Sequence, residues 1–311
     1  MTAPDSPSPT RSTTSPTAST APTIAVLGLG PMGAALARAA RAAGHPVHVW
    51  NRSPKDLAAL GLSAAAPITD PADPGEVDLV AICVRDHAAA RPLIDALAAR
   101  GTRVPVVNLS TGTPREARES ADHAQQLGLT YVTGAIMVPT PMVGTPDCLV
   151  LYAGAPAARP VVEPIVAAFG GAAEWTGDDH AIPPVLDLAM LDLYFVGMYG
   201  FLHSAALAEA HGIPPERYLP FATSITATLG ASLPDLSAAI TGRTYDGGEA
   251  RLDMCLAFLE KITAASAESR VPDVLPAVVR DASRSALQRW SPDTDWDCVM
   301  EGLRRLPADP R

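Results

Sequence analysis

The amino-acid sequence predicts an α/β Rossmann domain with a mostly parallel, doubly wound sheet, followed by an all-α domain. Three observations predict this fold class. Short apolar strands alternate with helical segments up to about residue 177, little strand character remains from residue 183 onward, and a long apolar helix joins the two patterns. Strands separated by helices imply a parallel sheet that is covered on both faces. We expect a Ser/Thr/Pro-rich disordered head over residues 1–22, the Rossmann domain over 23–180 and the helical domain over 181–311.

The expected strands of the first domain are short runs of apolar and β-branched residues. The first run, Thr23–Leu27, leads into a Gly-rich turn and an Ala-rich helix over Met32–Ala43. Another helix is expected after Thr113 and Pro114, because Thr caps helices and Pro suits the first turn. The remaining strands are expected at Pro46–Trp50, Asp78–Val84, Val104–Leu109, Leu129–Val132 and Cys148–Tyr152.

The second domain is expected to begin with a long helix over Val185–Ala210. Asp187, Asp192, His203 and Glu209 interrupt its apolar residues, and its longest uncharged run has about ten residues, whereas a bilayer requires about 20. We therefore interpret it as a helix buried in protein. At about 1.5 Å per residue it is about 39 Å long, which exceeds the needs of one small domain. Further helices are expected at about residues 215–230, 234–241, 250–268, 273–289 and 296–305.

Composition restricts the class of partner. Hydrophobic residues make up 48% of the chain and charged residues 18%, which leaves ample apolar material for a core. The net charge of −10, from 23 Lys and Arg against 33 Asp and Glu, disfavours nucleic acid and anionic lipid, because phosphate binding needs clustered cations. A small molecule is the expected partner. Of the first 22 residues 16 are Ser, Thr or Pro, so the head lacks the basic and apolar regions of a signal peptide.

The four cysteines, Cys83, Cys148, Cys255 and Cys298, are widely separated and form no Cys-x-x-Cys pair. Zinc ribbons and redox motifs are therefore unsupported, and no His, Asp or Glu cluster has the spacing of metal ligands. We expect no metal site, and we expect buried, reduced thiols in a cytoplasmic protein.

A dinucleotide site is indicated by three glycines that follow the first strand and open a helix. The first permits the tight turn, the second lets the backbone approach a pyrophosphate, and the third brings the helix against the strand. The helix N-terminus then faces the phosphate charge. We expect the whole turn to bind the cofactor: Gly28, Leu29, Gly30, Pro31, Met32 and Gly33. The alternative is a Gly-rich turn that binds nothing.

The end of the second strand indicates which dinucleotide is bound. An acidic residue there would accept a hydrogen bond from a ribose 2′-OH and would indicate NAD. This chain has Asn51, Arg52 and Ser53 instead, followed by Lys55. Arg offers a planar cationic fork and Ser a hydroxyl, and both suit a 2′-phosphate, so NADPH or NADP⁺ is favoured. The alternative is that Arg52 and Lys55 are merely solvated loop cations.

Two further strand ends are expected to line the nicotinamide half of the crevice, because ligands of doubly wound sheets bind beyond the carboxyl ends of the strands. Cys83 and Val84 end one strand, and Ser110 and Thr111 follow another. Either hydroxyl could bond the ribose or the carboxamide. Thr113 is at least as well explained as the cap of the next helix.

Asp187 is the candidate catalytic residue on the long helix. An apolar pocket would raise its pKa and make it a proton donor, or a counter-ion for a cationic substrate. The structural alternative is a carboxylate that the helix dipole stabilises near the first turn. Tyr194 and Phe195 share its helix face and could stack on a substrate, although core packing explains them equally well. His203 is more simply explained as a core or interface residue.

Five segments together resemble the imine reductases and reductive aminases, a branch of the β-hydroxyacid dehydrogenase superfamily. They are the Gly28–Gly33 turn, Asn108–Pro114, Ala135–Pro146, the helix of Asp187, and Arg251–Met254. The likeness covers essentially the whole chain after the head. It implies NADPH-dependent reduction of cyclic imines or iminium ions to amines, with or without prior condensation of an amine and a carbonyl compound. Hydride would pass to the iminium carbon, while Asp187 orients the nitrogen or delivers a proton.

The resemblance also implies a homodimer that exchanges its helical domains, so that residues 181–311 serve both dimerisation and substrate binding. Ile225, Met254 and Cys255 would then line the pocket from the partner chain. The hydroxyacid dehydrogenases of the superfamily carry Lys at the place of Asp187. The acid that this chain has there instead suits a substrate that arrives positively charged. A carbonyl reductase of that type is the alternative enzyme, and an NADP-binding sensor is the non-enzyme alternative.

Overall fold

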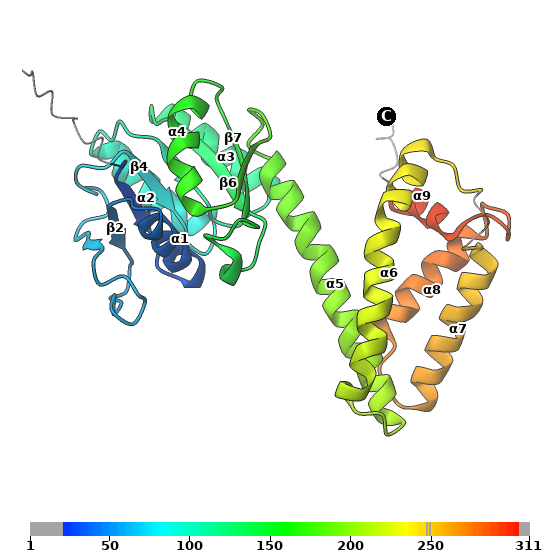
Figure 1. The fold of residues 1–311 in the computed structure, drawn as a ribbon. Helices are drawn as coiled ribbons and strands as arrows, with labels where there is room; N and C mark the ends of the chain where they lie inside the picture. Colours follow the sequence, from blue (N-terminus) through cyan, green and yellow to red (C-terminus); the bar gives the residue numbers. More distant parts are fainter. Residues whose placement is uncertain (1–20, 247, 249, 305–311) are drawn as a thin grey trace, which may run out of the picture. The chain divides into compact units, whose positions relative to one another are not determined.

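The computed structural model describes residues 21–246, 248 and 250–304 (Figure 1). The predicted head lies outside the described residues except for its last two. The chain forms two compact units, the first ending at Leu191 and the second beginning at Asp192. This division falls inside the long helix, α5 (Ile182–Ala210), whereas the boundary expected from the sequence, at 180/181, immediately precedes that helix.

The first unit is built on an eight-stranded sheet with the order β3-β2-β1-β4-β5-β6-β7-β8. All neighbouring strands run parallel except β6 and β7, which are antiparallel. The mostly parallel sheet predicted from the sequence is therefore confirmed, and all six expected strands are present. Short edge strands β3 and β8 were not expected. The strands are β1 (Ile24–Leu27), β2 (Val47–Trp50), β3 (Ala66–Pro67), β4 (Leu79–Ile82), β5 (Val106–Asn108), β6 (Tyr131–Ile136), β7 (Leu149–Gly154) and β8 (Ala172–Trp175).

Helices cover both faces of this sheet. Along β1, Ile24 and Val26 pack in one hydrophobic cluster with α1 (Pro31–Ala42) and α4 (Arg159–Val166). The intervening residues of β1 pack in a second cluster with α2 (His87–Ala99) and α3 (Pro114–Gln126). Alternate residues of a strand point to opposite faces, so a strand that is buried on both sides reads as a continuous apolar run.

The capping signals explain where two of these helices begin. Thr113 caps α3 as expected, since its hydroxyl accepts from the backbone N–H of Glu116 while the Glu116 carboxylate accepts from the N–H of Thr113. Helix α2 was not expected from the sequence. It begins after Asp86, whose carboxylate accepts from the N–H of Ala89 at 2.8 Å, and this acidic cap was the available signal.

The strand order reverses at β1, and this position determines where a ligand can bind. The first crossover, through α1, leads to β2 on one side of β1, whereas β4 lies on the other side. Because β1, β2, β4 and β5 are parallel, their carboxyl ends share one edge of the sheet. A crevice for a ligand is expected at such a switch point.

The second unit contains the later part of α5 and the helices that follow it. These are α6 (Pro215–Gly242), α7 (Leu252–Glu268), α8 (Val274–Ala286), the 3₁₀ turn η3 (Trp296–Val299) and α9 (Met300–Leu303). The prediction of two helices over 215–230 and 234–241 was wrong, because α6 continues through Pro234. A proline removes one backbone hydrogen-bond donor and bends a helix, but the helix can continue when the turns on both sides keep their hydrogen bonds. The helix expected over 296–305 is instead η3 followed by the short α9.

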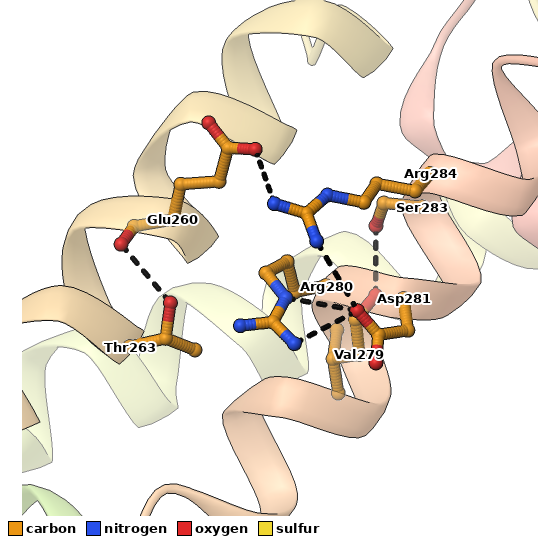
Figure 2. A network of polar contacts seen from close by, with 7 residues as sticks. All are labelled: Glu260, Thr263, Val279, Arg280, Asp281, Ser283 and Arg284. Atoms are coloured by element: carbon orange, nitrogen blue, oxygen red, sulfur yellow. Dashed lines mark hydrogen bonds and ion pairs between the residues drawn. The ribbon is translucent and has the colours of Figure 1, made fainter. Parts of the chain in front are cut away.

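Among its described residues, the second unit buries only a small apolar core. Tyr245, Leu252, Ala286 and Cys298 form it, and the rings of Tyr245 and Trp290 meet edge to face at 5.5 Å. An exposed ion pair joins α7 to α8, as Figure 2 shows: the Glu260 carboxylate pairs with Arg284 at 2.8 Å, and Arg284 also pairs with Asp281 on its own helix. Exposed ion pairs of this kind stabilise a fold by about 0.2–1 kcal/mol each.

Large apolar side chains stand exposed along the helices of the single chain. Helix α5 is long and apolar enough to cross a membrane by length and composition, and 6% of its most apolar window is buried. Soluble proteins rarely leave so much contiguous apolar surface uncovered. The side chains exposed on α5 to α8 in the second unit include Leu193, Tyr194, Phe195, Leu202, Leu219, Phe221, Ile225, Leu229, Phe258, Val274 and Val278.

Candidate cofactor-binding and active site

The three glycines of the turn after β1 differ in whether the surrounding protein leaves room for a side chain. Gly28 has φ +109°, and a Cβ there would lie 2.2 Å from the carbonyl oxygen of Cys83. A Cβ at Gly33 would lie 2.0 Å from the carbonyl oxygen of Gly28. At Gly30, by contrast, a Cβ would meet no atom within 4 Å. Packing therefore requires glycine at positions 28 and 33, whereas Gly30 leaves room for a group to approach the backbone.

The first turn of α1 is suited to an anion. It begins after Gly30, which provides no side-chain cap, and it contains no acidic residue. Its free N–H groups and the positive end of the helix dipole both attract negative charge. These residues therefore fit the pyrophosphate of a dinucleotide.

The loop after β2 is tied to this turn by one side chain. The Asn51 amide oxygen accepts from the backbone N–H of Leu29 at 2.9 Å, and its NH₂ group donates to the carbonyl of Ser53 at 2.7 Å. The side chain of Asn51 therefore shapes the turn. Arg52, Ser53 and Lys55 are exposed, and within the described part of the chain neither cation forms an ion pair. Both cations remain available to a phosphate group.

The ends of β4 and β5 are joined by hydrogen bonds. The hydroxyl of Ser110 accepts from the N–H of Val84 at 3.1 Å, and the N–H of Ser110 donates to the amide oxygen of Asn108 at 3.0 Å. Burial raises the pKa of Cys83 to about 12, so its thiol stays protonated, and its backbone carbonyl faces the glycine turn. Thr111 is exposed. The structure thus brings all the predicted cofactor residues to one edge of the sheet.

A buried polar layer, which was not expected from the sequence, supports this edge. The Asn108 NH₂ group donates to the hydroxyl of Tyr131 at 2.9 Å and lies 3.4 Å from the Nδ1 of His87. The same nitrogen of His87 lies 2.8 Å from the hydroxyl of Ser120. Burial lowers the pKa of His87, so the neutral ring is favoured, and burial raises the pKa of Tyr131. A polar residue ending a buried strand, such as Asn108, was the available signal.

Asp187 lies in the second turn of α5, within the first compact unit. It is 7% exposed, and its carboxylate forms no hydrogen bond with the described residues. Burial raises the pKa of Asp187. An acidic residue without a charge-stabilising partner favours its protonated form more than an ordinary carboxyl does. The catalytic role expected for Asp187 stays a prediction.

The start of α5 is attached to the sheet and to α3 by its preceding residues. Arg118 donates two hydrogen bonds to the carboxylate of Asp179, at 3.0 and 2.7 Å. The carbonyl of Asp179 accepts from the N–H of Ile182, and its carboxylate accepts from the N–H of Ala181. The Nδ1 of His180 lies 2.9 Å from the hydroxyl of Thr133 on β6.

The other candidate substrate residues belong to the second unit. Tyr194, Phe195 and Ile225 are 59–64% exposed in the single chain, Met254 is exposed, and Cys255 is half-buried. Their placement against the cofactor residues stays a prediction. Cys83, Cys148 and Cys298 are buried as expected, whereas Cys255 is not. Over residues 21–246, 248 and 250–304, no three His, Cys, Asp or Glu side chains are grouped to hold a metal ion.

Two family models match nearly the whole described chain. The NAD binding domain of 6-phosphogluconate dehydrogenase matches residues 23–177. The C-terminal domain of NADPH-dependent reductive aminase-like proteins matches residues 179–305.

Relatives of known structure or curated activity agree with these matches. The NADPH-dependent reductive aminase of Aspergillus oryzae is 30% identical over 267 residues, covering 83% of this chain and 89% of the relative. The reductive aminase of Aspergillus terreus in complex with NADPH4, cyclohexanone and allyl amine is 28% identical, with a TM-score of 0.83 over 92% of this chain and 100% of that one. The imine reductase of Myxococcus stipitatus in complex with NADP⁺ is 26% identical, with a TM-score of 0.85 over 91% and 100%.

Proposed function

This chain belongs to the family of NADPH-dependent reductive aminases and imine reductases, and we propose that it reduces the C=N bond of imines or iminium ions to give amines. It is an NADPH-dependent oxidoreductase that acts on small molecules. The observation that carries the proposal is the buried carboxyl of Asp187, which stands on a helix anchored to the same unit as the glycine turn. Its substrates are cyclic imines or imines formed from a carbonyl compound and an amine.

The chain's residues divide the binding of the cofactor among three loops. The turn at Gly28–Gly33 and the first turn of α1 hold the pyrophosphate, and Asn51 keeps the next loop in register with that turn. Arg52, Ser53 and Lys55 bind the 2′-phosphate, since a cationic fork and a hydroxyl suit it. Val84, Ser110 and Thr111 border the nicotinamide half. NADPH, when bound, supplies the hydride.

Asp187 acts on the nitrogen of the substrate. Its raised pKa keeps a proton on the carboxyl at higher pH than in water, so it can donate that proton to a neutral imine. When the substrate arrives as an iminium ion, the positive charge favours the ionised carboxylate, which then orients the nitrogen. Both roles require the carboxyl to stay away from bulk water, and its burial supports them.

The helical surfaces support a homodimer with exchanged helical domains. Tyr194, Phe195 and Ile225 expose more than half of their side chains in the single chain, and neighbouring apolar residues of α5 and α6 do the same. A second copy would cover them, and Ile225, Met254 and Cys255 of each chain would line the substrate pocket of the other chain. Burial against a second copy would also explain why α5 is apolar although it does not cross a bilayer.

The four free thiols fit a reducing compartment, so we place the protein in the cytoplasm.

A substrate panel tests the proposed reaction against its alternatives. Purified protein and NADPH are mixed with 1-pyrroline-type imines, with ketone and amine pairs, or with carbonyl compounds alone, and the absorbance of the reduced nicotinamide is followed. We expect oxidation of NADPH with imines or with paired substrates, and amine product by mass spectrometry. Turnover only with lone carbonyl compounds would support a hydroxyacid dehydrogenase-like carbonyl reductase, which the comparisons do not favour. Tight NADPH binding without any turnover would support a sensor.

A further inference from the structure

His180, two residues before the start of α5, contacts strand β6 of the sheet. His180 is half-buried, its Nδ1 lies 2.9 Å from the Thr133 hydroxyl, and its ring lies 5.9 Å from the ring of Tyr131. Thr133 is itself 2% exposed. His180 therefore connects the helix that carries Asp187 to a buried position of β6.

Thr133 is next to the buried polar layer that supports the cofactor loops. Thr133 pairs in register with Asn108 on β5, and Tyr131 lies two residues before Thr133, on the same face of β6. The Tyr131 hydroxyl accepts from Asn108, whose amide oxygen holds the N–H of Ser110. One set of buried contacts thus runs from the loop after β5 to the start of α5.

The other attachment of α5 is weaker. The Arg118–Asp179 ion pair has side chains that are 57% and 43% exposed, so solvent screens it. The His180 contact is shielded from solvent by comparison, and burial lowers the pKa of His180, which favours the neutral ring. A neutral imidazole facing a buried hydroxyl holds its geometry without an ionic partner.

We propose that His180, through its contact with Thr133, is a positioning residue that fixes the start of α5 and thereby the carboxyl of Asp187 relative to the cofactor loops. The inference rests on the proposed role of Asp187. His180 itself touches neither substrate nor cofactor in this scheme. A displacement of the carboxyl by about 1 Å would lower the rate of reduction by up to about 10²-fold.

The test compares variants that lose or keep the hydrogen bond. H180F keeps a ring beside Tyr131 but loses Nδ1, whereas H180N places an amide near the former Nδ1. T133V removes the hydroxyl from the other side of the contact, with T133S as the variant that keeps it. H48F is the matched control, because the Nδ1 of His48 makes a similar contact, 2.7 Å from the carbonyl of Pro74, far from α5 in the sequence.

We expect kcat for the imine to fall about 10- to 100-fold in H180F and T133V, with the Kd of NADPH unchanged within about twofold. H180N and T133S should recover most of kcat, and H48F should resemble the wild type. Hydrogen exchange, measured by mass spectrometry without substrate, should be faster over residues 182–191 in H180F and T133V. Should H180F fail to fold, T133V, which changes no ring, provides the same comparison.

Two outcomes separate failure of this inference from failure of the proposed function. If the wild type reduces imines and D187N is impaired while H180F and T133V match H48F, His180 has no positioning role. If the wild type reduces no imine, the proposed function fails. Unchanged exchange over residues 182–191 in both variants would overturn the anchoring of α5 whatever the activity, and faster exchange would support it.

Discussion

The two compact units differ in how completely they bury their own apolar side chains. In the first, both faces of an eight-stranded sheet are covered by helices, and residues as large as Tyr152 and Phe169 are fully buried. In the second, helix α6 has 28 residues and one buried side chain, Ala222. Of the largest fully buried side chains among the described residues, Leu252 alone belongs to this unit. The first unit therefore completes its own core, whereas the second presents apolar surfaces that its own chain does not cover.

The largest expected effect concerns the exposed apolar surface of the second unit. Phe221 on α6 is 69% exposed in the single chain. If a second copy covers it, F221E buries a charge twice in a symmetric dimer, and the dimer should weaken by more than about 10³-fold. Mass measurement by light scattering at increasing dilution checks this. V161E, at an exposed position on α4 of the first unit, is the control and should leave the mass unchanged. A monomeric wild type at all concentrations would contradict the prediction.

The next effect concerns the first unit and its buried carboxyl. D187N keeps the size of the side chain but removes the acid, so kcat for imine reduction should fall by about 10²-fold or more. The control is D192N, because Asp192 lies further along the same helix and is exposed. Steady-state kinetics at saturating NADPH measure both variants. Unchanged turnover in D187N would remove Asp187 from the mechanism.

A smaller effect tests the cofactor loop of the first unit. R52A should raise the KM for NADPH about tenfold while changing the KM for NADH little, because a charge-assisted bond to the 2′-phosphate contributes about 1.5–3 kcal/mol. R38A is a suitable control, since Arg38 donates to the carbonyl of Leu60 on the same unit. Equal changes for the two cofactors would reject a phosphate role for Arg52.

The smallest effect is a pH dependence of stability that originates in the first unit. Burial lowers the pKa of His87 below its ordinary value of 6.5, against the opposing effects of Glu116 and Asp86. The unfolded chain therefore binds this proton more readily, so the contribution of His87 to stability is present above pH 6.5 and is lost as the pH falls through the folded pKa. Thermal unfolding at pH 7.5 and 5.5 should show a smaller loss of Tm in H87Q than in the wild type. An equal loss in both would contradict it.

Local signals account for what was predicted well. The glycine turn, the alternation of strands and helices and the Thr113 cap each depend on neighbouring residues, so the sequence displays them. The prediction for α6 was wrong at Pro234, because packing can stabilise a helix that continues through a proline. The buried layer around Asn108 and Tyr131 could not be predicted in full, since its members lie far apart in the chain and only the parallel pairing of β5 with β6 brings them together.

If the helical domains are exchanged as proposed, two defective chains can repair each other. Under the proposed exchange, each site combines the first unit of one chain with the second unit of the other. A chain damaged at Arg52 and another damaged at Met254 would then form mixed dimers in which one site carries both defects and the other carries neither. Co-expression of two such impaired variants, assayed at low NADPH concentration, should therefore give more activity than either variant gives alone.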